Sequence, residues 1–153
     1  MGCQVTRGYT LIELVVVLLV LAVAAAVAAP AVGRTADRVK ARAEAAAVAN
    51  FLRSAREQAV TRQEPYEVVL DADARALLLR PAGPRADGRV QAARAVSPRV
   101  RIEAEPLSMR RIIFLPQGMS SGGHLRIEMP GSSPYVVTVD RLTGRVATHR
   151  GAS

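Results

Sequence analysis

The longest hydrophobic stretch of the chain lies near its N-terminus. Residues 14–33 carry no charged side chain. An α-helix rises about 1.5 Å per residue, so a helix of this length would measure about 30 Å, the thickness of a bilayer's hydrocarbon core. We therefore predict that residues 9–33 form a membrane-spanning helix. Glu13 stands at the start of this stretch, and an ionisable side chain in such a setting is costly and marks a functional position.

After this stretch the pattern becomes amphipathic. From residue 34 onward, small and hydrophobic residues recur at spacings of three and four, as expected for one face of an α-helix. The predicted buried stripe consists of Val39, Ala43, Ala47, Phe51, Leu52, Ala55 and Ala59. Its small side chains would let another element pack closely. Pro65 ends the pattern, so residues 34–64 are predicted to continue the helix into a globular domain.

Beyond Pro65 the hydrophobic period changes from helical spacing to two, which is typical of β-strands. Turn-forming residues at 71–75, 81–89, 116–123, 130–134 and 140–144 separate the candidate strands. These strands are 66–70, 76–80, 90–96, 99–103, 111–115, 124–129, 135–139 and 145–149. The pattern predicts a β domain over residues 65–153 with a hairpin at 71–75, and hence an α+β chain made of one domain and an anchor.

Composition adds a strong positive charge. The chain has 21 Lys and Arg against 13 Asp and Glu, for a formal charge of +8. Such a surface fits an anionic partner, whether nucleic acid, lipid headgroups or an acidic protein, but solvated arginines without a partner would give the same count. Aromatic residues are few, so the core must be built from Val, Leu, Ile and Ala.

Candidate catalytic or metal-binding residues are sparse. The two histidines, His124 and His149, are 25 residues apart, and the only cysteine lies at position 3, so no zinc ligand set is expected. The aspartates of 71–75 lack further calcium ligands after them. The serines of 120–121 have no recognisable His and Asp partners. We therefore expect no enzyme activity, no metal and no cofactor.

The N-terminal motif is the most specific signal. The sequence RGYTLIE at residues 7–13, followed by Leu, Val and Ala, resembles the class III signal of type IV pilins and pseudopilins, with Tyr where Phe is commonest. The resemblance implies that a prepilin peptidase removes residues 1–8 by cleaving between Gly8 and Tyr9, and that Tyr9 is then N-methylated. The new α-amine would lie one helical turn from Glu13 and could neutralise its carboxylate, within the chain or in a neighbour.

Two simpler interpretations compete with this one. A secretory signal peptide would have a basic start at Arg7, an apolar middle and an A-x-A-like cleavage site within 24–29. Glu13 and Pro30 both stand in poor positions for that signal. A plain membrane anchor explains the length but not Glu13. A lipoprotein is excluded because Cys3 precedes the apolar stretch.

A second resemblance covers the C-terminal half. The sequences IFLPQGMSSGG at 113–123, YVVTVD at 135–140 and LTGRV at 142–146 resemble the C-terminal domain of the GspH/FimT group, and LRSAREQA at 52–59 resembles its helix end. The resemblance implies a pilin-like α+β fold, with a long N-terminal helix packed on antiparallel β-sheets. It implies a minor pseudopilin near the tip of the type II secretion pseudopilus, supporting protein export across the outer membrane.

The same resemblance implies location and partners. The chain would cross the bacterial inner membrane once, with its C-terminal domain in the periplasm. Its partners would be other pseudopilins in a fibre, the prepilin peptidase, the inner-membrane assembly platform with its ATPase, and secreted proteins at the tip.

The group also includes minor pilins of type IV pili that bind DNA during uptake, through a Gly-Arg-x-Arg stretch near the C-terminus. Here that stretch reads GRVA at 144–147, so the second arginine is missing at its place. Arg145 and Arg150, together with the net charge, are the candidate DNA-binding residues of this alternative.

Overall fold

The computed structural model describes residues 10–83, 88–105 and 110–151, with the side chains of residues 27–36 left aside. The chain divides between Ala36 and Asp37 into two units. A single helix, α1 (Leu11–Arg62), contributes its first part to one unit and its remainder to the other. The two units are described separately.

The first unit contains the start of α1. Within the described residues, no helix is both long enough and apolar enough to cross a membrane. The predicted spanning segment, residues 9–33, includes Tyr9 and the side chains of 27–33, which lie outside the described ones. Its role as a membrane span stays a prediction.

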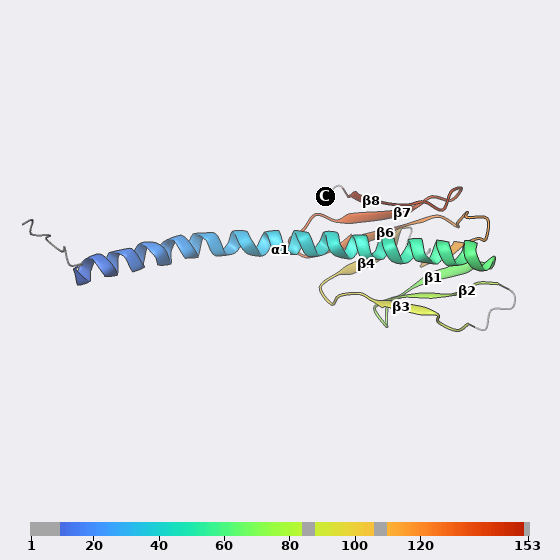
Figure 1. The fold of residues 1–153 in the computed structure, drawn as a ribbon, viewed down its shortest axis with the longest axis horizontal. Coiled ribbons are helices and arrows are strands. Elements are labelled where there is room, and N and C mark those ends of the chain that lie inside the picture. The colour runs from blue at the N-terminus through green and yellow to red at the C-terminus, as the bar shows by residue number, and fades with distance from the viewer. Residues whose placement is uncertain (1–9, 84–87, 106–109, 152–153) are drawn as a thin grey trace, which may run out of the picture. The chain divides into compact units, whose positions relative to one another are not determined.

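The second unit places the rest of α1 beside two antiparallel sheets (Figure 1). One sheet has the order β3-β2-β1-β5 and the other the order β4-β6-β7-β8. The bounds are β1 (Tyr66–Asp71), β2 (Ala76–Pro81), β3 (Ala92–Ala95), β4 (Arg101–Glu105), β5 (Arg111–Phe114), β6 (Gly123–Glu128), β7 (Tyr135–Val139) and β8 (Val146–Arg150). This is the predicted α+β fold, and each predicted strand is found with its ends shifted by at most about two residues.

The helix contributes a stripe of small residues to the core. Ala41, Ala45, Val48, Ala49, Leu52, Ala55 and Ala59 are all fully buried. The predicted stripe was correct from Leu52 onward but wrong at its start, because Val39 is 63% exposed and Ala43 is also exposed. Residues spaced four apart in an α-helix are offset by about 40° around its axis, because one turn contains 3.6 residues. A stripe built only from spacings of four therefore moves away from the buried face. In the observed stripe, spacings of four and three residues alternate, so the stripe stays on the buried face.

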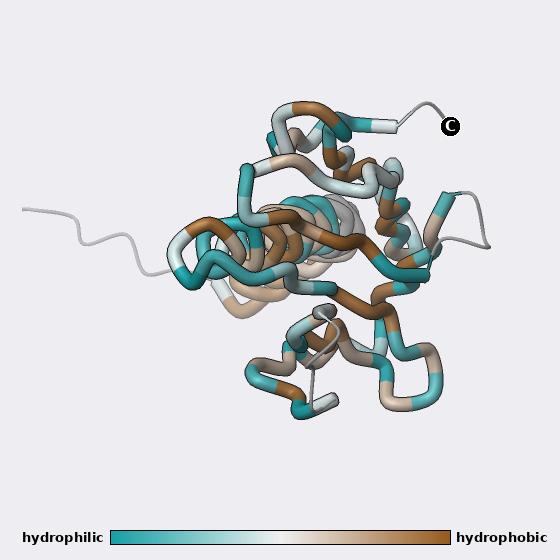
Figure 2. The backbone as a smooth tube through the Cα atoms, turned by 90° about the vertical axis from the view of Figure 1, so that its right-hand side faces the viewer, coloured by the Kyte–Doolittle hydropathy of each residue, from teal (hydrophilic) through white to brown (hydrophobic). Residues whose placement is uncertain are grey.

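The strands supply the other half of the core. Hydrophobic residues recur along the strands beside the helix (Figure 2). Both sheets contribute to one cluster with the helix, and its largest fully buried side chains from the strands are Tyr66, Phe114, Leu77, Leu79, Ile127 and Val137. Because the helix side is mostly alanine, these larger residues fill the space between the layers.

The β5–β6 loop carries the chain from one sheet to the other. At its end Gly122 and Gly123 have φ of 75° and 147°, conformations that favour glycine. Just before them, Ser121 donates its backbone N–H to the Ile113 carbonyl (2.8 Å) and accepts the Ile113 N–H on its hydroxyl (3.0 Å). Ser121 therefore satisfies the outer edge of β5 at Ile113, as a strand neighbour would.

Candidate assembly and docking surfaces

The start of α1 has the pattern of a capping box. Thr10 accepts the Glu13 backbone N–H on its carbonyl (3.1 Å) and on its hydroxyl (3.3 Å), and its carbonyl also accepts the Leu14 N–H (3.2 Å). Thr10 thus caps the helix and Glu13 occupies the third helical position, where a carboxylate also favours the helix dipole. Glu13 therefore lies in the first turn of the helix, where its negative charge is favourable, besides its predicted role in assembly.

The first turns of α1 expose hydrophobic side chains on every side. Leu11 is 82% exposed and Ile12 72%, and the large residues from Leu14 to Val23 are each at least half exposed. Glu13 is the only charged residue between Thr10 and Ala26, and its side chain is exposed. A helix that is apolar all round is not a surface helix of a soluble protein. Gly8 and Tyr9, the predicted cleavage and methylation positions, lie outside the described residues.

At the other end of α1 an arginine joins two turns. Arg56 donates from Nε to the carbonyl oxygens of Gly118 (3.3 Å) and Thr143 (3.2 Å), which belong to the loops after β5 and β7. Gly118 and Gly144 both have positive φ, and a Cβ on Gly118 would lie 3.1 Å from the Arg56 Nη2. We call Arg56 with residues 115–119 and 140–145 the turn cluster.

Asp140 fixes the second turn of this cluster. Its Oδ1 accepts the backbone N–H groups of Thr143 (2.7 Å) and Leu142 (3.1 Å) and the Thr143 hydroxyl (2.8 Å). These donors, led by the Thr143 N–H, lower the pKa of Asp140 because they stabilise its carboxylate. The turn holds Leu142 with 75% of its surface exposed.

The two candidate DNA-binding residues lie at opposite ends of β8. Arg145 precedes the strand, and its carbonyl accepts the Asp140 N–H (2.9 Å). Arg150 ends the strand and pairs with Tyr135. The two positions are five residues apart, which corresponds to about 17 Å of extended chain. Both are exposed, but they do not form one basic site.

The two histidines are brought together by the sheet. The rings of His124 on β6 and His149 on β8 both lie within hydrogen-bond distance of the Thr138 hydroxyl on β7, at 3.1 and 3.2 Å. Their separation by 25 residues in the sequence gives no sign of this contact, because it depends on the order of the strands in the sheet. Among the described residues, no group of three or more His, Cys, Asp or Glu could hold a metal ion.

The serines of the β5–β6 loop serve the backbone. Ser120 donates its hydroxyl to the Asp140 carbonyl (2.8 Å) and accepts the Gly122 N–H (3.0 Å), so it joins the loop to the turn cluster. Asp71 accepts the N–H groups of Asp73 and Ala74 and so closes the β1–β2 turn. These side chains thus stabilise the turns in which they lie.

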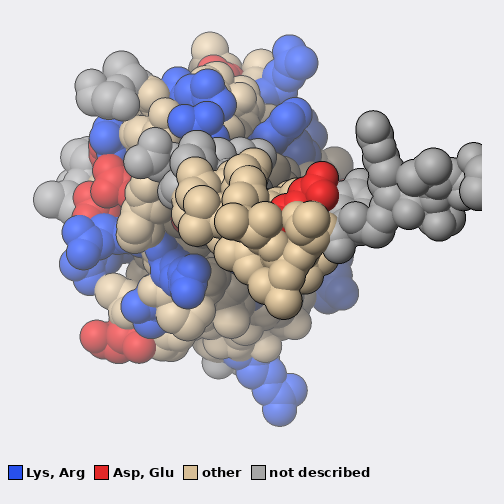
Figure 3. Space-filling model, turned by 90° about the vertical axis from the view of Figure 1, so that its left-hand side faces the viewer, with Lys and Arg blue, Asp and Glu red and all other residues tan. Residues whose placement is uncertain are grey.

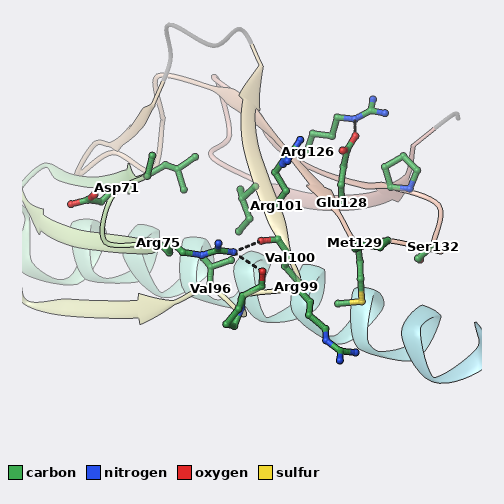
Figure 4. A pocket seen from close by; sticks show the side chains of 16 residues that line it. Asp71, Arg75, Val96, Arg99, Val100, Arg101, Arg126, Glu128, Met129 and Ser132 are labelled. Carbon is green, nitrogen blue, oxygen red and sulfur yellow. Dashed lines mark hydrogen bonds and ion pairs between the residues drawn. The ribbon is translucent and has the colours of Figure 1, made fainter. Parts of the chain in front are cut away.

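A cleft of about 790 Å³ lies at the end of the sheets opposite the turn cluster. Figure 4 shows the side chains that line it. Its walls come from the β1–β2 turn, the β3–β4 connection, β4 and the β6–β7 turn. Arg75 extends across one wall and donates to the carbonyls of Ser97, Pro98 and Val100 at 3.0–3.2 Å. Arg126 binds Glu128 (2.7 Å), which raises the pKa of Arg126. Arg99 and Arg101 also line the cleft.

The helix on two antiparallel sheets, with an apolar exposed start, defines a pilin-like α+β protein. Solved structures share the fold. The type IV minor pilin FimU of Pseudomonas aeruginosa is 13% identical with a TM-score of 0.62, over 74% of this chain and 90% of that one. The minor pseudopilin EpsH of the Vibrio cholerae type II secretion system is 16% identical with a TM-score of 0.58, over 76% and 98%.

Sequence comparison gives the family. Residues 44–143, about two thirds of the chain, match the family described as type II transport protein GspH, and residues 4–29 match the prokaryotic N-terminal methylation motif. The chain belongs to the GspH family. No curated protein matches it significantly. The resemblance drawn from the N-terminal motif and the C-terminal loops is confirmed.

Proposed function

We propose that this chain is a minor pseudopilin that joins the pseudopilus of a type II secretion system near its tip and supports protein export across the outer membrane. The observation that carries the proposal is the apolar surface of α1, exposed all round from Leu11 to Val23 and interrupted only by Glu13. Such a surface needs lipid before assembly and neighbouring helices afterwards. The family match over residues 44–143 supports the choice of system.

In this proposal a prepilin peptidase cleaves between Gly8 and Tyr9 and the new Tyr9 amine is methylated. The helix then holds the subunit in the bacterial inner membrane, with the globular unit in the periplasm. The assembly platform, driven by its ATPase, moves the subunit into the fibre, where it contacts other pseudopilins and, at the tip, secreted proteins. The chain itself is a structural part without a catalytic role.

Glu13 is given the role of an assembly determinant. The helix begins at Leu11, so a terminus created at Tyr9 would stand just before the Thr10 cap. A methylated amine there and a Glu13 carboxylate of a neighbouring subunit would neutralise each other inside a bundle of apolar helices. A charge left without its partner in such surroundings is strongly unfavourable, so pairing would select one register of the helices.

Mass spectrometry of the protein purified from its native membrane tests the processing step. The expected product begins with an N-methylated Tyr9. An intact residue 1, or a terminus near Pro30, would contradict the proposal. Crosslinking of the assembled fibre, followed by identification of the partners, tests the system: other secretion pseudopilins are expected.

The alternative is a minor pilin of a type IV pilus that binds DNA, and the structural similarity to FimU keeps it open. The separation of Arg145 and Arg150 along β8 is unfavourable to a single DNA site there. The alternative predicts salt-sensitive binding of duplex DNA by the full chain in detergent, lost in Arg145→Gln/Arg150→Gln. Absence of binding at low salt would remove it.

A further inference from the structure

Unpaired cations gather at the end of the globular unit where the cleft lies. We call Arg38, Lys40, Arg42, Arg99, Arg101 and Arg150 the basic collar. All six are exposed, and within the described residues none of them forms an ion pair. Lys and Arg side chains lie on several sides of the globular unit when it is viewed toward this end (Figure 3).

Strand register shows that the collar residues of the sheet lie at one level. Arg150 pairs with Tyr135, Tyr135 with Ile127, and Ile127 with Ile102. Arg101 lies one residue beyond this row, opposite Glu128, and Arg99 precedes it in the chain. The sheet therefore presents Arg99, Arg101 and Arg150 along the same end.

The helix residues of the collar reach the same level. Arg53 donates to the carbonyl of Val146 (3.2 Å), which fixes the start of β8 beside that point of α1. Arg150 is four residues further along β8, about 13 Å, and the strand runs beside the helix (Figure 1). At 1.5 Å per residue this distance corresponds to about nine helical residues, which places Arg150 level with Glu44. Arg42, Lys40 and Arg38 follow immediately.

The acidic residues of this end are mostly engaged. Glu44 binds Arg94 (2.8 Å), Glu128 binds Arg126, and Asp71 accepts two backbone N–H groups of its own turn. Asp37, Asp73 and Glu103 form no ion pair within the described residues, and the six cations of the collar outnumber them. The end therefore carries a net positive charge that the fold does not neutralise.

The position of these cations in the sequence points to lipid. Arg38 follows the apolar stretch ending at Gly33 by five residues, so chain length alone keeps it within about 17 Å of that point. The proposed topology puts residues 34–42, with four basic side chains, on the periplasmic side, whereas the only basic leader residue, Arg7, is removed. Basic residues that flank a membrane span normally lie on the cytoplasmic side. The need to orient the span therefore does not explain basic residues on the periplasmic side.

We infer that the basic collar binds the headgroups of anionic phospholipids in the outer leaflet of the inner membrane and holds the globular unit against the bilayer before assembly. The inference rests on the proposed membrane anchoring. Each basic residue near an anionic surface favours contact by roughly fivefold, and the effect acts within about 8 Å at physiological salt. Entry into the fibre would break these contacts.

Energy transfer in vesicles tests the inference. Processing after Gly8 removes Cys3, so one introduced cysteine carries the fluorophore: Ala74→Cys beside the cleft, or the exposed Thr61→Cys near the other end of α1. The acceptor is a headgroup-labelled lipid. Vesicles contain phosphatidylcholine alone or with phosphatidylglycerol. Phosphatidylglycerol should increase transfer from residue 74, not from residue 61, and added salt should abolish the increase.

A charge-matched pair of variants assigns the effect. Arg38→Gln/Lys40→Gln/Arg42→Gln should lower the docked-to-undocked ratio about fivefold per residue, whereas Arg62→Gln/Arg141→Gln/Arg145→Gln, at the turn-cluster end, should leave it unchanged. Equal transfer in both vesicle types, or equal loss in both variants, overturns the inference. Duplex DNA bound through the collar without any phosphatidylglycerol effect also overturns it.

Flotation of the vesicles separates this inference from the proposed function. A chain that does not insert into either vesicle contradicts the membrane anchoring, and the lipid inference falls with it. A chain that inserts but shows no phosphatidylglycerol dependence contradicts the lipid contact alone.

Discussion

Gly144 lies against the backbone of Gly118 so closely that a Cβ added to Gly144 would overlap the Gly118 carbonyl oxygen. The same Cβ would lie 2.9 Å from the Arg56 Nε. Two turns from different parts of the chain and one helix residue thus meet where no side chain fits. This contact closes the turn cluster at the end of the two sheets.

Gly144→Ala should therefore destabilise the protein by about 2–4 kcal/mol, since alanine at a φ of 61° is strained and its methyl group must displace backbone. Gly131→Ala is the matched control, because Gly131 has a φ of 78° but nothing within 4 Å of its Cβ. It should cost only about 1 kcal/mol. Denaturant unfolding of the full chain in detergent, followed by circular dichroism, measures both. Equal losses would show that strain, not the close approach, matters.

Glu67→Gln should destabilise the first sheet. Glu67 is 6% exposed on β1 and binds Arg80 on β2 and Arg111 on β5 (3.6 Å). The two arginines are partly exposed, so the loss should be about 1–2 kcal/mol, below that of a fully buried pair. Glu128→Gln, which removes a partly exposed partner of Arg126, should change stability by less than about 0.5 kcal/mol. A similar loss in both variants would contradict the importance of burial.

Asp140 should contribute to acid sensitivity. Its pKa is lowered in the folded chain by the Thr143 and Leu142 donors, so its contribution to stability is present above the unfolded pKa of about 3.9 and is lost as pH falls through the folded value. Stability of Asp140→Asn should therefore depend less on pH below about 4 than that of the unchanged chain. Asp73→Asn is the control. A carboxyl titration of Asp140 at an ordinary pKa would contradict the prediction.

Glu13→Ala should be cleaved normally but should enter fibres poorly, because an unpaired neighbouring amine would cost about 3–5 kcal/mol inside the helix bundle. Crosslinking of assembled fibres measures incorporation. Glu13→Gln separates charge from capping, since glutamine also completes a capping box with Thr10. Incorporation of Glu13→Gln at the unchanged level would assign Glu13 to helix capping alone.

Local patterns predicted most of the fold. Period two located every strand, and Pro65 marked the end of the helix to within a few residues of Arg62, because alternation and turn residues are local properties. The buried helix face was missed at Val39 and Ala43, where many alanines give several possible stripes. Packing against the sheets determines which stripe is buried, and the hydrophobic pattern does not predict how the strands are ordered in those sheets.

Contacts between distant residues could not be predicted. Arg56 meets Gly118 and Thr143, which lie 62 and 87 residues away, and the three are joined only because the loops after β5 and β7 end at the same level. The histidines converge on Thr138 through the same pairing of strands. The N-terminal site is different, since the sequence of residues 7–13 alone carries its motif.

The strand edges have a consequence for crowding. Ser121 occupies the hydrogen-bonding groups of Ile113 at the border of one sheet, and Arg53 takes the Val146 carbonyl at the border of the other. Sheets with open borders tend to zip together edge to edge when many copies are concentrated. Because these groups are already hydrogen-bonded, they cannot pair with a strand of another copy. Copies concentrated in the membrane are therefore less prone to aggregate through their strands, and assembly proceeds through the helices.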